Sequence, residues 1–179
     1  MILTVGNKVV YPCQGPCLVS SVIEKIIADV PESFYHLELL DDSGGELFVP
    51  VDKVQAIGVR LLLKKSEIPK LLRQLMTATE VTKDWKQRAR DTFKLFSSGS
   101  AFDLAEIVES LTTLSERKSL SIRESWTLAK ARKLLVCEIS EVMGKTRISA
   151  EERVDQALNV RKTASVDEIL NPPLAVNAC

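Results

Sequence analysis

Cationic side chains crowd around a tryptophan in the stretch DWKQRARDTFKLF, residues 84–96. At about 100° per residue, one stripe of a helix over this stretch carries Trp85, Ala89, Phe93 and Phe96. The roughly opposite side carries the cations Lys83, Lys86, Arg90 and Lys94, with Arg88 between the two sides. Such cations are suited to neutralising nucleic-acid phosphates. The chemistry that this stretch favours is therefore recognition of an anion.

Two interpretations of Trp85 fit this pattern. In the first, the ring is a core residue at the helix start and packs against Phe93. In the second, a first-turn tryptophan projects beyond the packed body while Phe93 and Phe96 stay buried. Proteins insert such apolar side chains between base steps of the minor groove, and flanking cations can then hold the strands. The pattern alone leaves both interpretations open.

A second basic segment lies at residues 116–133. Its cations are Arg117, Lys118, Arg123, Lys130, Arg132 and Lys133, against Glu116 and Glu124, so the net charge is +4 (6 − 2). The segment is either another part of an anion-binding surface or an ordinary solvated helix face. Apolar residues at positions 122, 129 and 136 share a helical face with Trp126 and predict that Trp126 is a core residue.

Patterns for catalysis or metal binding are weak. His36 is the only histidine, and no nucleophile motif lies near it. Cys13 and Cys17 are four residues apart, but zinc needs two further ligands at suitable spacing, so a turn with two small apolar side chains is expected. No glycine-rich phosphate loop is present, and Cys137 in LLVCEI is typical of a core residue. We predict that the protein is not an enzyme and uses no metal or cofactor.

The composition is typical of an ordinary folded protein, and the charge distribution makes the middle segment of the chain basic. The 179 residues are 45% hydrophobic and 27% charged, with 24 cations and 24 anions. The net charge is −2 over residues 1–65 (6 − 8), +4 over 66–133 (13 − 9) and −2 over 134–179 (5 − 7). No signal peptide or bilayer-spanning run is visible. The four scattered cysteines favour a reducing, cytoplasmic compartment.

The first 63 residues have the pattern of a β module. Short runs rich in β-branched and aromatic residues are VVYP (9–12), CLVSSVI (17–23), FYHLELL (34–40) and ELFVPV (46–51). Turn segments with proline or glycine separate them. Several short strands at this spacing predict a small barrel or a strongly curved sheet.

Residues 64–160 have the pattern of a helical module. Capping residues predict five helices: 68–76 after Ser66, 85–97 after Asp84 or Thr82, 101–115 after Ser100, 122–143 after Ser121, and 150–158 after Ser149. Gly99 and Gly144 are expected to end the second and fourth of them. Residues 161–179 have little periodicity and two prolines, and predict a mobile tail. The fold class is therefore α+β, in two modules.

At this point the chain resembles the CarD/CdnL family of bacterial transcription regulators. The resemblance is carried by VGNKVVYPCQG (5–15), FVPVDKVQAIGVR (48–60), DWKQRARDTFKLFSSGS (84–100) and LSIRESWTLAKARKLL (120–135). It implies an N-terminal Tudor-like or SH3-like barrel that binds the RNA polymerase β subunit. It also implies a compact all-helical C-terminal domain that contacts promoter DNA near the upstream edge of the −10 element. Such a protein would act as a monomer at the nucleoid, with no membrane partner.

The resemblance also suggests roles for particular residues. Trp85 corresponds to a tryptophan that wedges into the minor groove at the upstream fork and slows collapse of the bubble, largely without base-specific contacts. Positions of DNA-contacting cations in the family correspond to Arg88, Arg90, Lys130 and Arg132. Arg123 lies in the loop-to-helix turn beside the last two and is expected to contact DNA with them. Gln87 stands where a second arginine is usual and Ala89 where an aromatic is usual, which predicts weaker DNA affinity unless Lys86 compensates.

On the β module, the resemblance directs attention to one strand and one lysine. Lys25 aligns with a position that is often basic and faces polymerase. Phe48, Val49 and Pro50 lie where an edge strand could pair with polymerase by strand addition, although Phe48 could equally be a core residue. Two alternatives stay open: a polymerase-binding module without functional DNA contact, and an RNA- or ribosome-associated adaptor, which rests on fold analogy alone.

Overall fold

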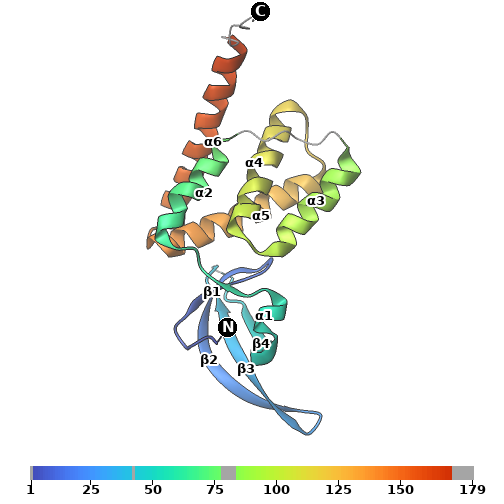
Figure 1. The fold of residues 1–179 in the computed structure, drawn as a ribbon, viewed down its shortest axis with the longest axis vertical. Coiled ribbons are helices and arrows are strands. Elements are labelled where there is room, and N and C mark those ends of the chain that lie inside the picture. Colours follow the sequence, from blue (N-terminus) through green and yellow to red (C-terminus); the bar gives the residue numbers. More distant parts are fainter. Residues whose placement is uncertain (1, 42, 78–83, 171–179) are drawn as a thin grey trace, which may run out of the picture.

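The computed structural model describes residues 2–41, 43–77 and 84–170, with side chains up to Arg161. A β module and a helical module follow one another along the chain and pack end to end (Figure 1). The fold class is α+β, as predicted. In the described residues, no helix is both long enough and apolar enough to cross a membrane.

Five antiparallel strands form the sheet of the β module. They are β1 (Lys8–Tyr11), β2 (Gly15–Ile27), β3 (Val30–Leu39), β4 (Glu46–Pro50) and β5 (Arg60–Leu61). Their order is β4-β3-β2-β1-β5, which makes β4 and β5 the edges. The four predicted strands are confirmed, but β2 and β3 together extend as a long hairpin beyond their predicted ends (Figure 1). Ala28 and Asp29 both have positive φ at its tip, as a two-residue hairpin turn of type I′ requires.

One face of this sheet carries the core of the β module. Val9, Val19 and Leu37 are fully enclosed, together with Cys17. The Tyr35 hydroxyl accepts a hydrogen bond from the Leu3 amide at 3.1 Å, which fixes the chain ahead of β1. Alternation along β3 sends the neighbouring residue His36 to the opposite face. The core is small, as expected for a module of about 60 residues.

The connection from β4 to the helices is more structured than the sequence predicted. It contains the short helical turns η1 (Val51–Lys53), α1 (Val54–Ile57) and, after β5, η2 (Lys65–Glu67). Gly58 ends α1 with φ 86°, a conformation that favours glycine. The helical module then contains α2 (Ile68–Leu75), α3 (Trp85–Ser98), α4 (Ala101–Arg117), α5 (Ile122–Met143) and α6 (Arg147–Leu170).

The sequence correctly predicted the helix caps that are formed by residues close together in the chain. The Asp84 side chain accepts from the Lys86 amide at the start of α3, and Ser121 and Glu124 form a reciprocal capping box on α5. Gly99 and Gly144 end α3 and α5 in the left-handed region. Two cap predictions were wrong. Ser66 lies inside η2, and the Thr146 hydroxyl, which accepts from the Ser149 amide at 3.2 Å, takes the place predicted for Ser149.

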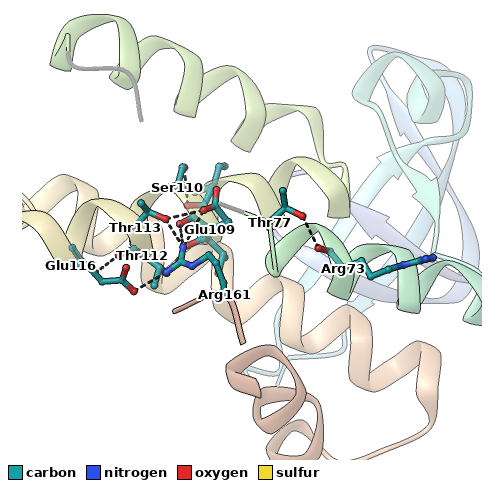
Figure 2. A network of polar contacts seen from close by, with 11 residues as sticks. Arg73, Thr77, Glu109, Ser110, Thr112, Thr113, Glu116 and Arg161 are labelled. Atoms are coloured by element: carbon teal, nitrogen blue, oxygen red, sulfur yellow. Dashed lines mark hydrogen bonds and ion pairs between the residues drawn. The ribbon is translucent and has the colours of Figure 1, made fainter. Parts of the chain in front are cut away.

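Helix α6 is much longer than the predicted 150–158 segment, and Figure 1 shows it extending past the other helices. Residues 161–170, the first part of the predicted mobile tail, continue this helix. A buried arginine attaches α6 to the helical module: Arg161 is only 3% exposed and extends toward α4 (Figure 2). Its guanidinium donates to Glu109 Oε1 at 3.0 Å, to the Thr113 hydroxyl, and to Glu116 Oε1 at 2.7 Å. The remainder of the predicted tail, residues 171–179, lies outside the described residues.

Polar contacts join the two modules at the predicted boundary. Glu138 on α5, only 1% exposed, accepts two hydrogen bonds from Arg60 at 2.7 and 2.8 Å and one from the Leu63 amide at 3.0 Å. The backbone of Gly15 also lies close to α5, because a Cβ added at Gly15 would lie 2.8 Å from the Leu134 side chain. The modules are thus held in one orientation by a charge-assisted pair and by close packing.

Candidate nucleic-acid and partner interfaces

Helix α3 attaches to its neighbours in an unusual way, because its only buried side chain is an arginine. Arg88 is 9% exposed and donates to Glu124 Oε1 of α5 from Nε at 3.1 Å and from a terminal nitrogen at 2.9 Å. Burial raises the pKa of Glu124, but the Ser121 donors and the Arg88 guanidinium outweigh it and lower the pKa below its usual value. Glu124 therefore carries its charge at neutral pH and holds α3 against the start of α5.

The apolar stripe of α3 faces outward. Trp85 and Phe93 are each 64% exposed, and Ala89 between them is also exposed. Partly buried Leu95 and Phe96 make the apolar contacts of this helix with the core. The core interpretation of Trp85 is therefore wrong, and so is the prediction that Phe93 is buried.

Trp126 on α5 is also exposed, at 60%, so its predicted place in the core is wrong. The buried residues of α5 begin only at Ala131. The N-terminal half of this helix therefore extends beyond the packed core, and Ile122 at its start is 92% exposed. Periodicity correctly grouped these side chains on one face, but in this half of the helix no core covers that face.

The outward faces of α3 and α5 enclose a groove of about 940 Å³. We call it the aromatic groove and define it by six of its apolar lining residues, Trp85, Phe93, Phe96, Leu111, Leu120 and Trp126. A lysine lies near the face of each indole: Lys86 Nζ is 5.7 Å from the Trp85 ring centroid, and Lys130 Nζ is 5.2 Å from that of Trp126. Both distances fall within the range of cation–π attraction.

The predicted DNA-contacting cations divide into two groups. Lys86, Arg90 and Arg123 are exposed, and Lys130 is half-buried at the groove. Arg88 is engaged by Glu124, as described above. Arg132 binds two carboxylates of α6, Asp155 at 2.6 Å and Glu151 at 3.3 Å.

Gln87 has a role that the sequence did not reveal. Its amide oxygen accepts from Arg90 at 2.8 Å, while its amide nitrogen donates to Asp91 at 2.8 Å. The residue that replaces an expected arginine thus orients the neighbouring arginine. Arg90 is thereby displayed on the outer side of α3 with its charge retained.

On the β module, two of the residues predicted to contact a partner, Lys25 and Phe48, form a stack with His36 on the outer face of the sheet. Lys25 Nζ lies 4.0 Å from the Phe48 ring centroid. The Phe48 ring stacks on His36 with centroids 4.8 Å apart and an interplanar angle of 10°. Phe48 is 45% exposed, so it is a surface residue, whereas Val49 is 2% exposed and faces the core. Only the backbone of Val49 can take part in strand addition at the β4 edge.

The sequence missed an apolar surface at the end of the β2–β3 hairpin. Ile26 is 78% exposed and Val30 is 56% exposed, and Val22 and Ile27 are about half exposed. In the stretch VIEKII, two apolar residues follow Glu24 and Lys25, beyond Ile23 where the predicted strand ended. That continuation was the available signal for this surface.

The three cysteines that the structure describes, Cys13, Cys17 and Cys137, have no metal-binding or nucleophilic arrangement. Burial raises the pKa of Cys17 to about 12 and also raises the pKa values of Cys13 and Cys137. Their thiols are therefore protonated at neutral pH, whereas metal binding and nucleophilic attack need the thiolate. Throughout the part of the chain that the structure describes, no cluster of three or more His, Cys, Asp or Glu side chains could hold a metal ion.

Comparison with known proteins identifies both modules. Residues 3–61 match the profile of the CarD-like/TRCF RID domain, and residues 67–155 match the CarD C-terminal domain. The proposed transcription factor YdeB of Bacillus subtilis (strain 168) is 21% identical over 143 residues, which cover 79% of this chain and 93% of YdeB.

A solved structure is also similar in sequence to the β module. The solution structure of the 72-residue N-terminal domain of Myxococcus xanthus CarD is 42% identical, and the match covers 34% of this chain and 79% of that domain, with a TM-score of 0.29. The two domain profiles follow one another in order and meet where the two modules join. The chain belongs to the CarD/CdnL family.

Proposed function

We propose that this protein is a non-enzymatic transcription regulator that bridges RNA polymerase and promoter DNA. The β module binds the polymerase β subunit, and the helical module stabilises the open promoter near the upstream edge of the −10 element. The observation that carries the proposal is the outward projection of Trp85 from a helix whose own anchor is polar. A ring that the core does not need is available to intercalate.

The wedge is supported by exposure and by charge. Trp85 is 64% exposed at the first residue of α3, and Lys86 lies against its ring. An apolar wedge unstacks a base step at a cost of a few kcal/mol, which is offset when the deformed DNA contacts more of the protein. Lys86, Arg90 and Arg123 are exposed cations that can bind the backbone without reading bases. Arg88 positions α3 through Glu124, and we no longer assign it a phosphate contact.

Polymerase binding is supported by family membership and by the Lys25–Phe48–His36 stack. This stack presents one cation and one aromatic ring on the outer face of β2, β3 and β4, beside the edge strand β4. Rigid aromatic side chains beside a cation are typical of residues that dominate interface energies. An edge strand also offers unpaired backbone groups for strand addition.

Open-complex lifetime measures the proposed activity. We expect Trp85→Ala to bind polymerase as the native protein does but to shorten the lifetime that the native protein confers by at least about tenfold. Ile148→Ala, which removes an exposed side chain on α6, is the matched control and should leave the lifetime unchanged. An unaltered lifetime with Trp85→Ala would falsify the wedge.

Charge reversal tests the polymerase face separately. Lys25→Glu should weaken capture of polymerase in a pull-down and remove the stabilisation of the open complex, because the charge beside Phe48 is inverted. Lys53→Glu, on η1, is the control with the same change of charge. Equal capture by native protein and Lys25→Glu would remove Lys25 from the interface.

A second candidate function is polymerase binding without functional DNA contact. The engagement of Arg132 by Asp155 and Glu151 favours it, because that cation is already neutralised. Under this alternative, Trp85→Ala and Lys86→Glu would leave the open complex unaffected, whereas Lys25→Glu would still reduce polymerase capture.

A further inference from the structure

We infer that the aromatic groove binds unpaired bases of a single DNA strand, so that it stores part of the melted promoter beside the wedge. This inference rests on the proposed contact of α3 with promoter DNA and extends it from one ring to a surface. The aromatic rings concerned are Trp85 and Phe93 on α3 and Trp126 on α5. They line one groove, although they come from two helices.

The three rings are too far apart to act as one wedge, and a wedge needs only one of them. Trp85 and Phe93 are eight residues apart, which is about 12 Å along a helix. Adjacent bases in a stacked strand are about 3.4 Å apart, so the two rings cannot enter the same base step. Trp126 lies on another helix altogether. Three rings along one groove are instead suited to several successive bases.

Leaving these rings exposed to water has an energetic cost. Phe93 is 64% exposed and Trp126 is 60% exposed, in a module whose core is closed by other residues. A contiguous apolar surface that the core does not use usually marks an interaction site. At about 940 Å³, the groove is at the upper end of the range for ligand pockets. It is therefore large enough for an extended ligand.

The net charge of the groove lining favours a single nucleic-acid strand as the occupant. The ionisable groups of the lining are Arg88, Lys118, Arg123 and Lys130 against the single carboxylate Glu124. Arg88 and Glu124 neutralise each other, so Lys118, Arg123 and Lys130 leave the groove positive. Aromatic platforms within a positive groove are the arrangement that proteins use for single strands, because every base has a π face and every nucleotide carries a phosphate. A purely apolar peptide would leave these cations without counter-charges.

Tryptophan fluorescence offers a direct measurement, because both tryptophans of the chain line the groove. In the full chain carrying Trp85→Phe, Trp126 is the only tryptophan, and excitation at the red edge of the absorption band selects its emission over that of the two tyrosines. We expect a 12-mer of thymidine to quench it and to bind at least about tenfold more tightly than a 12-base-pair duplex. Three groove cations predict a slope of log K against log salt of about −2. Equal quenching by strand and duplex, or no quenching, would overturn the inference.

Two side-chain truncations test whether the aromatic rings are responsible for single-strand binding. Trp126→Ala and Phe93→Ala should each weaken single-strand binding by about 5- to 100-fold, the range expected for loss of one base–aromatic stack. Ile122→Ala removes a still more exposed apolar side chain of α5 from outside the lining and should change nothing. Unchanged affinity in both truncations would contradict the inference. Sedimentation that showed self-association abolished by Trp126→Ala would also contradict it, with a second copy as the occupant.

Open-complex lifetime separates this inference from the proposed function. Shortening by both Trp85→Ala and Trp126→Ala would support the groove. Shortening by Trp85→Ala alone would leave the wedge intact and overturn the groove. If neither variant shortened the lifetime, the wedge and the groove would both be wrong.

Discussion

Helices α3 and α6 are both joined to their neighbours through an arginine, but the rest of each helix is used differently. Helix α6 adds a buried apolar face of Ala150, Val154, Ala157 and Leu158 to its Arg161 anchor. Helix α3 has Arg88 as its only buried side chain and carries its largest rings outside. Helix α6 therefore has a structural role. Helix α3 is held by a polar contact that leaves an apolar stripe available to a partner.

The contrast explains how a protein can expose tryptophan without losing its fold. The core of the helical module is closed by α2, α4, α5 and α6, with only partly buried side chains from α3. Removing an exposed ring then costs little stability, whereas removing either arginine leaves a carboxylate without its partner. The expected loss of stability is therefore largest for removal of a buried arginine and smallest for removal of an exposed ring.

Arg161→Ala should have the largest effect. It leaves Glu109, 1% exposed, without its counter-charge, and loss of one partner from a buried pair costs about 3–5 kcal/mol. Urea denaturation of the full chain would measure the free energy of unfolding. Arg153→Ala, on the exposed side of the same helix, should stay within about 0.5 kcal/mol of the native protein. A comparable loss in both variants would remove Arg161 as the anchor.

Arg88→Ala should cost less, about 2 kcal/mol, because Glu124 keeps its hydrogen bonds to Ser121 and is partly solvated. A double-mutant cycle with Glu124→Gln should give a coupling of about 1 kcal/mol or more between the two side chains. Arg90→Ala is the exposed control. Additive free energies in the cycle would mean that Arg88 does not hold α3 through Glu124.

The Glu124 contact should also make stability depend on pH. The pKa of Glu124 is lowered in the folded protein, so its contribution is complete above the unfolded value of about 4.3 and is lost as pH falls through the folded value. Glu124→Gln preserves the cap but removes the titration. The difference in free energy of unfolding between native and variant proteins should therefore shrink as the pH falls from about 5 to about 3. This window brackets the pKa of glutamate in the unfolded chain. A constant difference across that window would contradict the assignment.

Phe93→Ala should have the smallest effect on stability, within about 0.5 kcal/mol, because the ring is 64% exposed. Phe96→Ala is the matched change one turn away. Its ring packs against the core, so it should cost at least about 1 kcal/mol more. Thermal melts of the two variants would compare them. Equal destabilisation would mean that the stripe of α3 is part of the core after all.

The sequence predicted those features that depend on neighbouring residues. The four main strands, the Asp84 cap, the Ser121 capping box and the glycine helix ends all follow from local chemistry. The exposed wedge was one of two open interpretations, and periodicity could not choose between them. Periodicity shows which side chains share a face, but tertiary packing decides whether that face is covered.

The features that the sequence did not predict depend on contacts between distant residues. Arg161 and Glu109 are 52 positions apart, and their pairing attaches α6 to α4 at the first residue of the segment predicted to be a tail. Arg60 and Glu138 are 78 positions apart and fix the orientation of the modules. A lone arginine in a weakly periodic segment gives no sign of a buried partner. Trp126 was misassigned because its apolar neighbours Ile122 and Ala129 are themselves exposed.

In the proposed function, the exposed ring at the start of α3 enters promoter DNA. Site-specific photocrosslinking tests it most directly, with a photoreactive benzophenone side chain in place of Trp85 in an open complex of polymerase and promoter. We expect crosslinks to DNA at the upstream edge of the −10 element, and none from the same group in place of Ile148 on α6. Crosslinks from position 85 to polymerase alone, with none to DNA, would contradict the claim.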